Sequence, residues 1–121
     1  MLSLRKGSGI MFEIKKLKFK HILQIDHLMI DRQITCLIGP SGSGKTTLLR
    51  MLNRLNEAEE GSIYFNGVDI KEMHPIKLRR KIIMLGQTPI LYPGTIADNL
   101  QIGLRLSEQP LADENRLRAY L

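Results

Sequence analysis

The chain has 121 residues, a formal net charge of +6 and a hydrophobic fraction of 43%. This length suits one domain or part of one, and the composition allows a packed core. No apolar run reaches the roughly 20 residues of a membrane-spanning helix, and the basic start lacks the apolar stretch of a secretory signal. The single cysteine, Cys36, excludes an internal disulfide and favours a reducing compartment.

The excess of basic residues favours polyanionic partners, such as the phosphates of a nucleotide. Modules that bind nucleic acid interleave aromatic and basic residues, and only 5% of this chain is aromatic. We therefore expect no nucleic-acid partner. The densest basic cluster, at 77–81, is interpreted as a solvated helix end.

The first half of the chain has strand character. Residues 1–10 show no periodic pattern and are predicted to be a disordered or artefactual extension, which makes 11–121 the domain proper. Alternating apolar residues predict a strand over 11–19, and β-rich character continues over 22–30. The continuous apolar run at 34–38 predicts a strand buried on both faces.

A helix is predicted from Lys45 to about residues 53–56, because leucines and a methionine recur on one helical face. Residues 61–70 predict two strands around an Asn-Gly turn. Pro75 is expected to open a short helix through Arg80.

The apolar run at 81–85 predicts a second buried strand, followed by a loop rich in Gly and Pro. Thr95 and Asp98 have the spacing of a capping box, so a helix is expected from about Ile96. The tail, 110–121, has helical propensity and ends on an apolar face, as in a chain that is cut.

The sequence GPSGSGKT, at 39–46, matches the phosphate-loop motif G-x-x-x-x-G-K-[ST]. Glycines let backbone N–H groups approach a triphosphate, and the following helix adds unpaired donors at its N-terminus. Lys45 can reach the β and γ phosphates, and the Thr46 hydroxyl can ligate Mg²⁺. The alternative interpretation is a glycine-rich linker whose sequence matches the phosphate-loop motif by chance. The residues expected to contact the nucleotide are Gly39, Pro40, Ser41, Gly42, Ser43, Gly44, Lys45 and Thr46.

The stretch GPSGSGKTTLL, with Gln87 some forty residues later, resembles the ATP-binding subunits of ABC transporters over residues 11–121. The resemblance implies that Thr47 also touches phosphate. It further implies that Gln87 contacts Mg²⁺ and the attacking water, and couples to the membrane subunit. An aromatic ring that stacks on adenine would be Phe19 or His21, where the family usually has a tyrosine.

The resemblance implies an α/β fold, with a P-loop NTPase core, an antiparallel β insertion and the start of an α-helical subdomain, truncated at the C-terminus. It implies ATP and Mg²⁺ as cofactors, and hydrolysis coupled to transport through a transmembrane permease, in the cytoplasm at the inner face of the membrane. A second ATP-binding subunit would complete a dimer. The segment after Gln87 is similar to the exporter type.

Two other functions stay open. The 121 residues contain no LSGGQ-like signature, and no four-residue apolar run ending in Asp-Glu follows Gln87. The chain could therefore be a truncated nucleotide-binding or interaction module without turnover. Another P-loop enzyme, such as a small kinase, is the other alternative, and the β insertion argues against it.

Overall fold

The computed structural model describes residues 11–32 and 34–119. These residues divide into two units, one ending at Leu85 and one beginning at Gly86. The extension predicted for residues 1–10 lies outside the described residues, as does the end of the apolar face predicted for the tail. None of the helices described is long and apolar enough to cross a bilayer.

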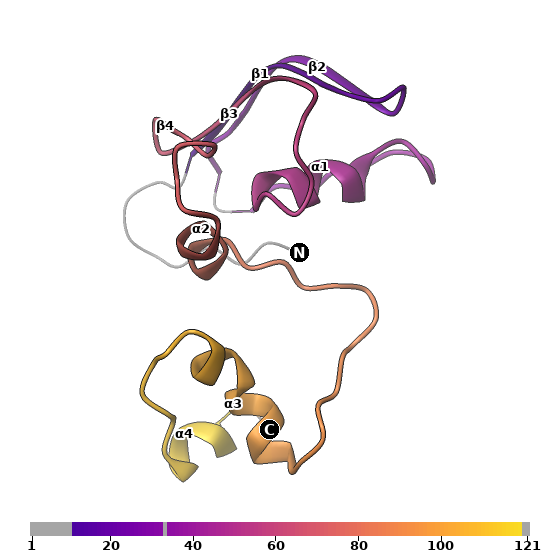
Figure 1. The fold of residues 1–121 in the computed structure, drawn as a ribbon. Coiled ribbons are helices and arrows are strands. Elements are labelled where there is room, and N and C mark those ends of the chain that lie inside the picture. The colour runs from indigo at the N-terminus through magenta and orange to yellow at the C-terminus, as the bar shows by residue number, and fades with distance from the viewer. Residues whose placement is uncertain (1–10, 33, 120–121) are drawn as a thin grey trace. The chain divides into compact units, whose positions relative to one another are not determined.

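The first unit is built on a four-stranded antiparallel sheet in the order β2-β1-β3-β4 (Figure 1). The predicted strands at 11–19, 22–30 and 61–70 are confirmed. Asn66 and Gly67 both have positive φ, 50° and 82°, as a tight hairpin turn requires. The strands are β1 (Phe12–Phe19), β2 (Leu23–Ile30), β3 (Glu60–Phe65) and β4 (Val68–Asp69).

A β-bulge interrupts β1 where it runs beside β3. Lys15 pairs with Ser62, but the next pair is Lys18 with Glu60, so β1 has one extra residue. Lys16 has a φ of 48°, and Gly61 opposite has a φ of 88°. A Cβ atom on Gly61 would lie 2.3 Å from the Lys16 carbonyl oxygen, so only glycine fits there.

The bulge explains why the apolar alternation changes phase along β1. Phe12 and Ile14 are buried, and the next buried residue is Leu17, not residue 16. The paired strand β2 changes phase at the same level, since its partly buried residues are Leu23 and Ile25, then Leu28 and Ile30. The register between β1 and β2 is therefore unbroken.

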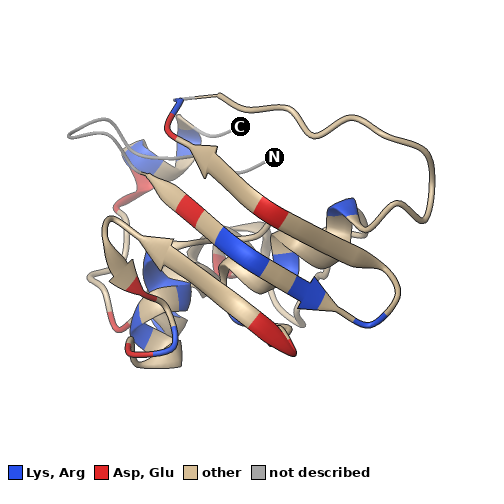
Figure 2. Ribbon diagram, turned by 90° about the horizontal axis from the view of Figure 1, so that it is seen from above, with Lys and Arg blue, Asp and Glu red and all other residues tan. Residues whose placement is uncertain are grey.

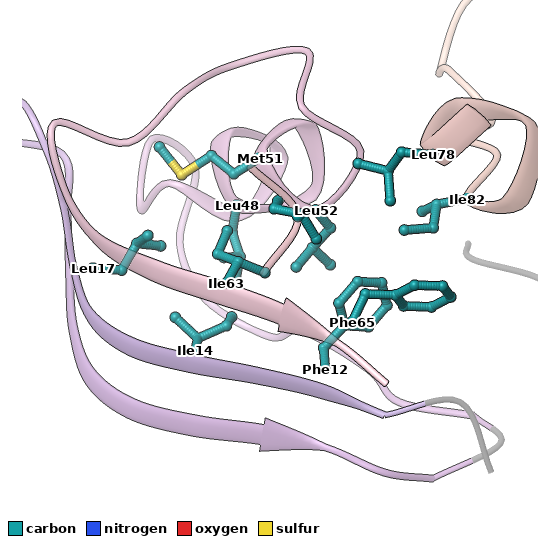
Figure 3. Packing of buried hydrophobic residues seen from close by; sticks show 11 residues of the cluster. Phe12, Ile14, Leu17, Leu48, Met51, Leu52, Ile63, Phe65, Leu78 and Ile82 are labelled. Carbon is teal, nitrogen blue, oxygen red and sulfur yellow. The ribbon is translucent and has the colours of Figure 1, made fainter. Parts of the chain in front are cut away.

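Helix α1 (Lys45–Leu52) begins at the predicted residue and ends just before the predicted range of 53–56. It packs its buried face against the sheet (Figure 3). Helix α2 (Pro75–Lys81) adds its one buried side chain, Leu78, to the same cluster. Burying side chains of this size contributes about 1.5–3 kcal/mol each. The cluster comprises Phe12, Ile14, Leu17, Leu48, Met51, Leu52, Ile63, Phe65, Ile70, Leu78 and Ile82.

Two arginines hold the end of α1. Arg54 has a φ of 57°, and its guanidinium donates to the carbonyls of Ile70 and Met73 at 3.3 and 3.0 Å. Arg79 donates to the carbonyls of Asn53 and Arg54 at 3.3 and 2.6 Å. The basic cluster at 77–81 is thus not only a solvated helix end, because Arg79 caps α1.

The buried strands predicted at 34–38 and 81–85 are wrong for the described residues. Ile34 and Ile38 are 80% and 95% exposed, and Ile83 and Leu85 are 69% and 77% exposed. A buried strand needs hydrogen-bonding neighbours and apolar cover on both faces. Neither run pairs with the described sheet.

The second unit contains α3 (Ile96–Leu106) and α4 (Glu114–Arg118). The predicted capping box is confirmed, because the amide of Asp98 donates to the Thr95 hydroxyl at 3.1 Å and the amide of Thr95 to the Asp98 carboxylate at 2.9 Å. The Thr95 hydroxyl and amide hydrogen bonds hold the pKa of Asp98 below its usual value.

Candidate functional site

The predicted phosphate loop connects the exposed run at 34–38 to helix α1. Gly42 and Gly44 have φ values of 79° and 90°, and Gly44 is the N-cap of the helix. The Leu48 amide donates to the Gly44 carbonyl at 2.8 Å, which is the first helical hydrogen bond. The loop is therefore followed directly by a helix, as predicted, and the unpaired amides of the first helical turn face the loop.

The ammonium of Lys45 lies over this loop. Its Nζ donates to the carbonyl oxygens of Gly39 and Pro40 at 2.8 and 2.6 Å, and to the Ser43 hydroxyl at 3.2 Å. An ammonium has three donors, and here each has an acceptor. A phosphate oxygen that approaches Lys45 would replace the longest contact, to Ser43, and could leave the two carbonyl contacts in place.

The electrostatic setting favours an anion. Helix α1 has no acidic residue in its first turn, so no carboxylate of that turn opposes the positive end of the helix dipole or the charge of Lys45. Thr46 is exposed and Thr47 is partly buried, both in that first turn. Hydroxyl oxygen is a ligand type that Mg²⁺ accepts, so Thr46 fits the predicted metal role.

The exposed face of the sheet carries both charge signs (Figure 2). Lys15 and His27 both contact the Glu13 carboxylate at 3.1 Å, and Lys18 contacts Glu60 at 3.0 Å. The hydrogen bond from Lys15, followed by that from His27, holds the pKa of Glu13 below its usual value. The positive net charge is therefore not gathered into one basic field on this face.

The two predicted base-stacking residues lie at the end of β1 and in the turn that follows it. Phe19 is partly buried and packs against the core, with Lys20 Nζ 5.3 Å from its ring centre. His21 is exposed. The same turn reaches the phosphate loop, because a Cβ atom on Gly44 would lie 3.3 Å from the Ile22 side chain and 3.1 Å from that of Leu23.

The structure thus brings Gly44 of the loop against Ile22 and Leu23, which follow Phe19 and His21 in the chain. Gln87 belongs to the second unit, where it is exposed in an irregular segment. Ile22 and Leu23 were missed as neighbours of the loop. The sequence around these two residues predicts only a strand, and no neighbouring residue indicates which distant loop they contact. Among the described residues, no cluster of His, Cys, Asp and Glu could hold a metal ion by itself.

Comparison with known proteins identifies the family of the chain. The family model described as ABC transporter matches residues 24–121. The chain is 49% identical over 81 residues to "ABC transporter I family member 17" of Arabidopsis thaliana, covering 67% of this chain and 31% of that protein. It is 51% identical over 77 residues to "Protein STAR1" of Oryza sativa, covering 64% and 22%. It is 38% identical over 105 residues to "Phosphate import ATP-binding protein PstB 3" of Natronomonas pharaonis, covering 78% and 38%.

A solved structure supports the predicted fold class. The "Structure of a bacterial Atm1-family ABC exporter with ATP bound" superposes with a TM-score of 0.77 at 23% identity, covering 98% of this chain and 21% of that one. The α/β P-loop fold with an antiparallel sheet is therefore confirmed. The chain spans 22–38% of the length of the three relatives. Because the family model covers most of the chain, the chain belongs to the ABC transporter family.

Proposed function

We propose that the chain binds Mg²⁺–ATP through residues 39–47, as a nucleotide-binding part of an ABC transporter ATPase. The observation that carries the proposal is the position of Lys45. Two loop carbonyls hold its ammonium over the N-terminus of α1, where the loop amides and the helix dipole also favour phosphate. A neutral glycine-rich linker would not need a cation held in this way.

Each site residue has a proposed role. Lys45 and the amides of Gly39, Pro40, Ser41, Gly42, Ser43 and Gly44 surround the phosphates, and Thr47 orients them. The hydroxyl of Thr46 and the side-chain oxygen of Gln87 are hard ligands of the kind that Mg²⁺ prefers. Phe19 or His21 would stack on adenine. Bound Mg²⁺ would neutralise charge on the phosphates during transfer to water.

In the whole protein, we propose that ATP hydrolysis drives transport through a separate membrane permease. A second ATP-binding subunit would complete the site, and the permease would hold the protein at the cytoplasmic face of the membrane. An exporter-type partner agrees with the solved exporter, whereas the archaeal relative is named an import protein. Transport measured with the complete protein in vesicles decides the direction.

Calorimetric titration with Mg²⁺–ATP tests the binding site. Lys45→Ala should lose about 1.5–3 kcal/mol of binding free energy, because it removes a charge-assisted contact to phosphate. Lys77→Ala, which removes an exposed lysine from α2, is the matched control and should bind as the unchanged chain does. Equal affinity of the Lys45 variant and the unchanged chain would refute the assignment of the loop.

A phosphate-release assay separates binding from turnover. Hydrolysis needs a carboxylate that polarises the attacking water, and in the 121 residues no four-residue apolar run ending in Asp-Glu follows Gln87. We expect the chain to release phosphate no faster than background. Turnover that depends on Lys45 would show that the chain is catalytically complete.

A further inference from the structure

Gly44 differs from the rest of the phosphate loop in its surroundings. Residues 39–43 are all exposed, whereas Gly44 is buried. A Cβ atom at this position would lie 3.1 Å from Leu23 Cδ1, 3.3 Å from Ile22 Cγ2 and 3.3 Å from the Ile22 carbonyl oxygen. The turn between β1 and β2 therefore packs directly on the last residue of the loop.

That turn is itself held in place. The Ile22 amide donates to the Phe19 carbonyl at 3.2 Å, which closes the turn. The Lys20 amide donates to the Glu59 carboxylate at 3.1 Å, and the Glu59 amide donates to the Lys18 carbonyl at 3.0 Å. The turn is thus fixed to the segment that leads into β3, and it can act as a firm support.

The loop has few other restraints. Within residues 39–43, the Ser43 amide donates to the Pro40 carbonyl at 3.3 Å. Lys45 donates to the carbonyls of Gly39 and Pro40 and to the Ser43 hydroxyl, and phosphate would replace the last of these contacts. Gly44 has a φ of 90°, a conformation that glycine adopts freely and also leaves freely. Its orientation matters, because Gly44 is the N-cap from which the amides of α1 begin.

We infer that Ile22 is a positioning residue for the phosphate loop. Its side chain packs on Gly44 and limits the backbone of that residue to the N-cap conformation, so that the first amides of α1 already point toward the phosphate position. This inference rests on the proposed function of the loop. It assigns Ile22 a role toward the phosphates, unlike the role toward adenine proposed for Phe19 and His21.

Ile22 is also the testable member of the contact. Leu23 pairs with Phe19 in the sheet and packs against the core, so its replacement would disturb the fold. Ile22 lies outside the strands and is 47% exposed. The atom that reaches Gly44 is Cγ2, which valine keeps and alanine lacks.

The experiment titrates the 121-residue chain with Mg²⁺–ATP and, separately, with inorganic tripolyphosphate, which has no base. Ile22→Ala should weaken both ligands by about tenfold, since binding must then order the backbone of one more residue. Ile22→Val should restore both affinities to within about twofold. Ile76→Ala, at an isoleucine of α2 that is 55% exposed, should leave both unchanged. Amide hydrogen exchange at Gly44 should be faster in Ile22→Ala than in Ile22→Val.

Three results would overturn the inference. Unchanged affinity for tripolyphosphate in Ile22→Ala would show that the contact does not position the loop. A loss confined to ATP would make Ile22 a base contact instead. Loss of cooperative thermal unfolding in Ile22→Ala would show that Ile22 is a core residue instead. Lys45→Ala is titrated in parallel, because only its failure to weaken binding would remove the proposed function itself.

Discussion

The bulge in β1 leaves no room for a side chain at Gly61, the residue opposite it in β3. A Cβ atom there would lie 2.3 Å from the Lys16 carbonyl oxygen, 2.5 Å from the Lys16 carbonyl carbon and 2.6 Å from the Lys15 carbonyl oxygen. All three are backbone atoms, so no flexible side chain can move aside. Gly61→Ala must therefore shift the backbone of β1 or β3.

The cost of Gly61→Ala has two parts. Forcing an extra carbon into a packed site costs about 1–3 kcal/mol. Holding alanine at the φ of 88° costs a further amount, about 1–3 kcal/mol for a residue in a sparsely populated conformation. The sum, about 2–6 kcal/mol, is a large part of the stability of a small domain, about 5–15 kcal/mol.

Urea unfolding followed by circular dichroism measures this loss. Gly103→Ala is the matched control, because it lies within helix α3 and a Cβ there meets nothing within 4 Å. That substitution should be neutral or stabilising by up to about 1 kcal/mol. A destabilisation below about 0.5 kcal/mol for Gly61→Ala would refute the geometry of the bulge.

Three further predictions address other parts of the chain. Arg54→Ala should destabilise the chain by about 1–3 kcal/mol in the same urea assay, because it removes the guanidinium donor to the Met73 carbonyl and one of the two donors to the Ile70 carbonyl. A loss no larger than that of an exposed arginine such as Arg50 would contradict this. Ser43→Ala should change the Mg²⁺–ATP affinity measured by calorimetry by no more than about threefold, because phosphate replaces the Ser43 hydroxyl as an acceptor for Lys45. A loss of about tenfold would mean that the hydroxyl itself binds phosphate. The lowered pKa of Asp98 means that its ionised form stabilises the start of α3. This contribution is present above the ordinary pKa of Asp and is lost as the pH falls through the lowered pKa. The helical content of α3, followed by carbon chemical shifts, should therefore decrease below about pH 4. The D98N variant should not show this decrease.

Local chemistry was read correctly from the sequence. The Asn66-Gly67 turn, the Thr95 cap and the order of loop and helix around Lys45 each depend on a few adjacent residues. Such features need no knowledge of distant neighbours, because the backbone conformation and the capping bond are set within one turn.

Long-range features could not be read in this way. The apolar run at 34–38 has the composition of a buried strand, yet burial depends on a pairing partner that composition does not reveal. The contact of Ile22 with Gly44 joins distant positions in the chain, and Gly61 looks like an ordinary turn glycine until Lys16 is placed opposite it. The guanidinium network of Arg54 likewise links segments that no periodicity connects.

The shared phase change in β1 and β2 has a consequence for how this hairpin can vary in length. Removing Lys16 alone would restore regular alternation and leave Leu17 facing the core, but it would break the pairing of Leu17 with Ile25. Removing one exposed residue from each strand at this level would keep the pairing and both faces, but it would shorten the hairpin by about 3.3 Å and carry Ile22 away from the loop. Insertions and deletions in the two strands are therefore tied to each other, and the nucleotide site is sensitive to strand length at a position that it never touches.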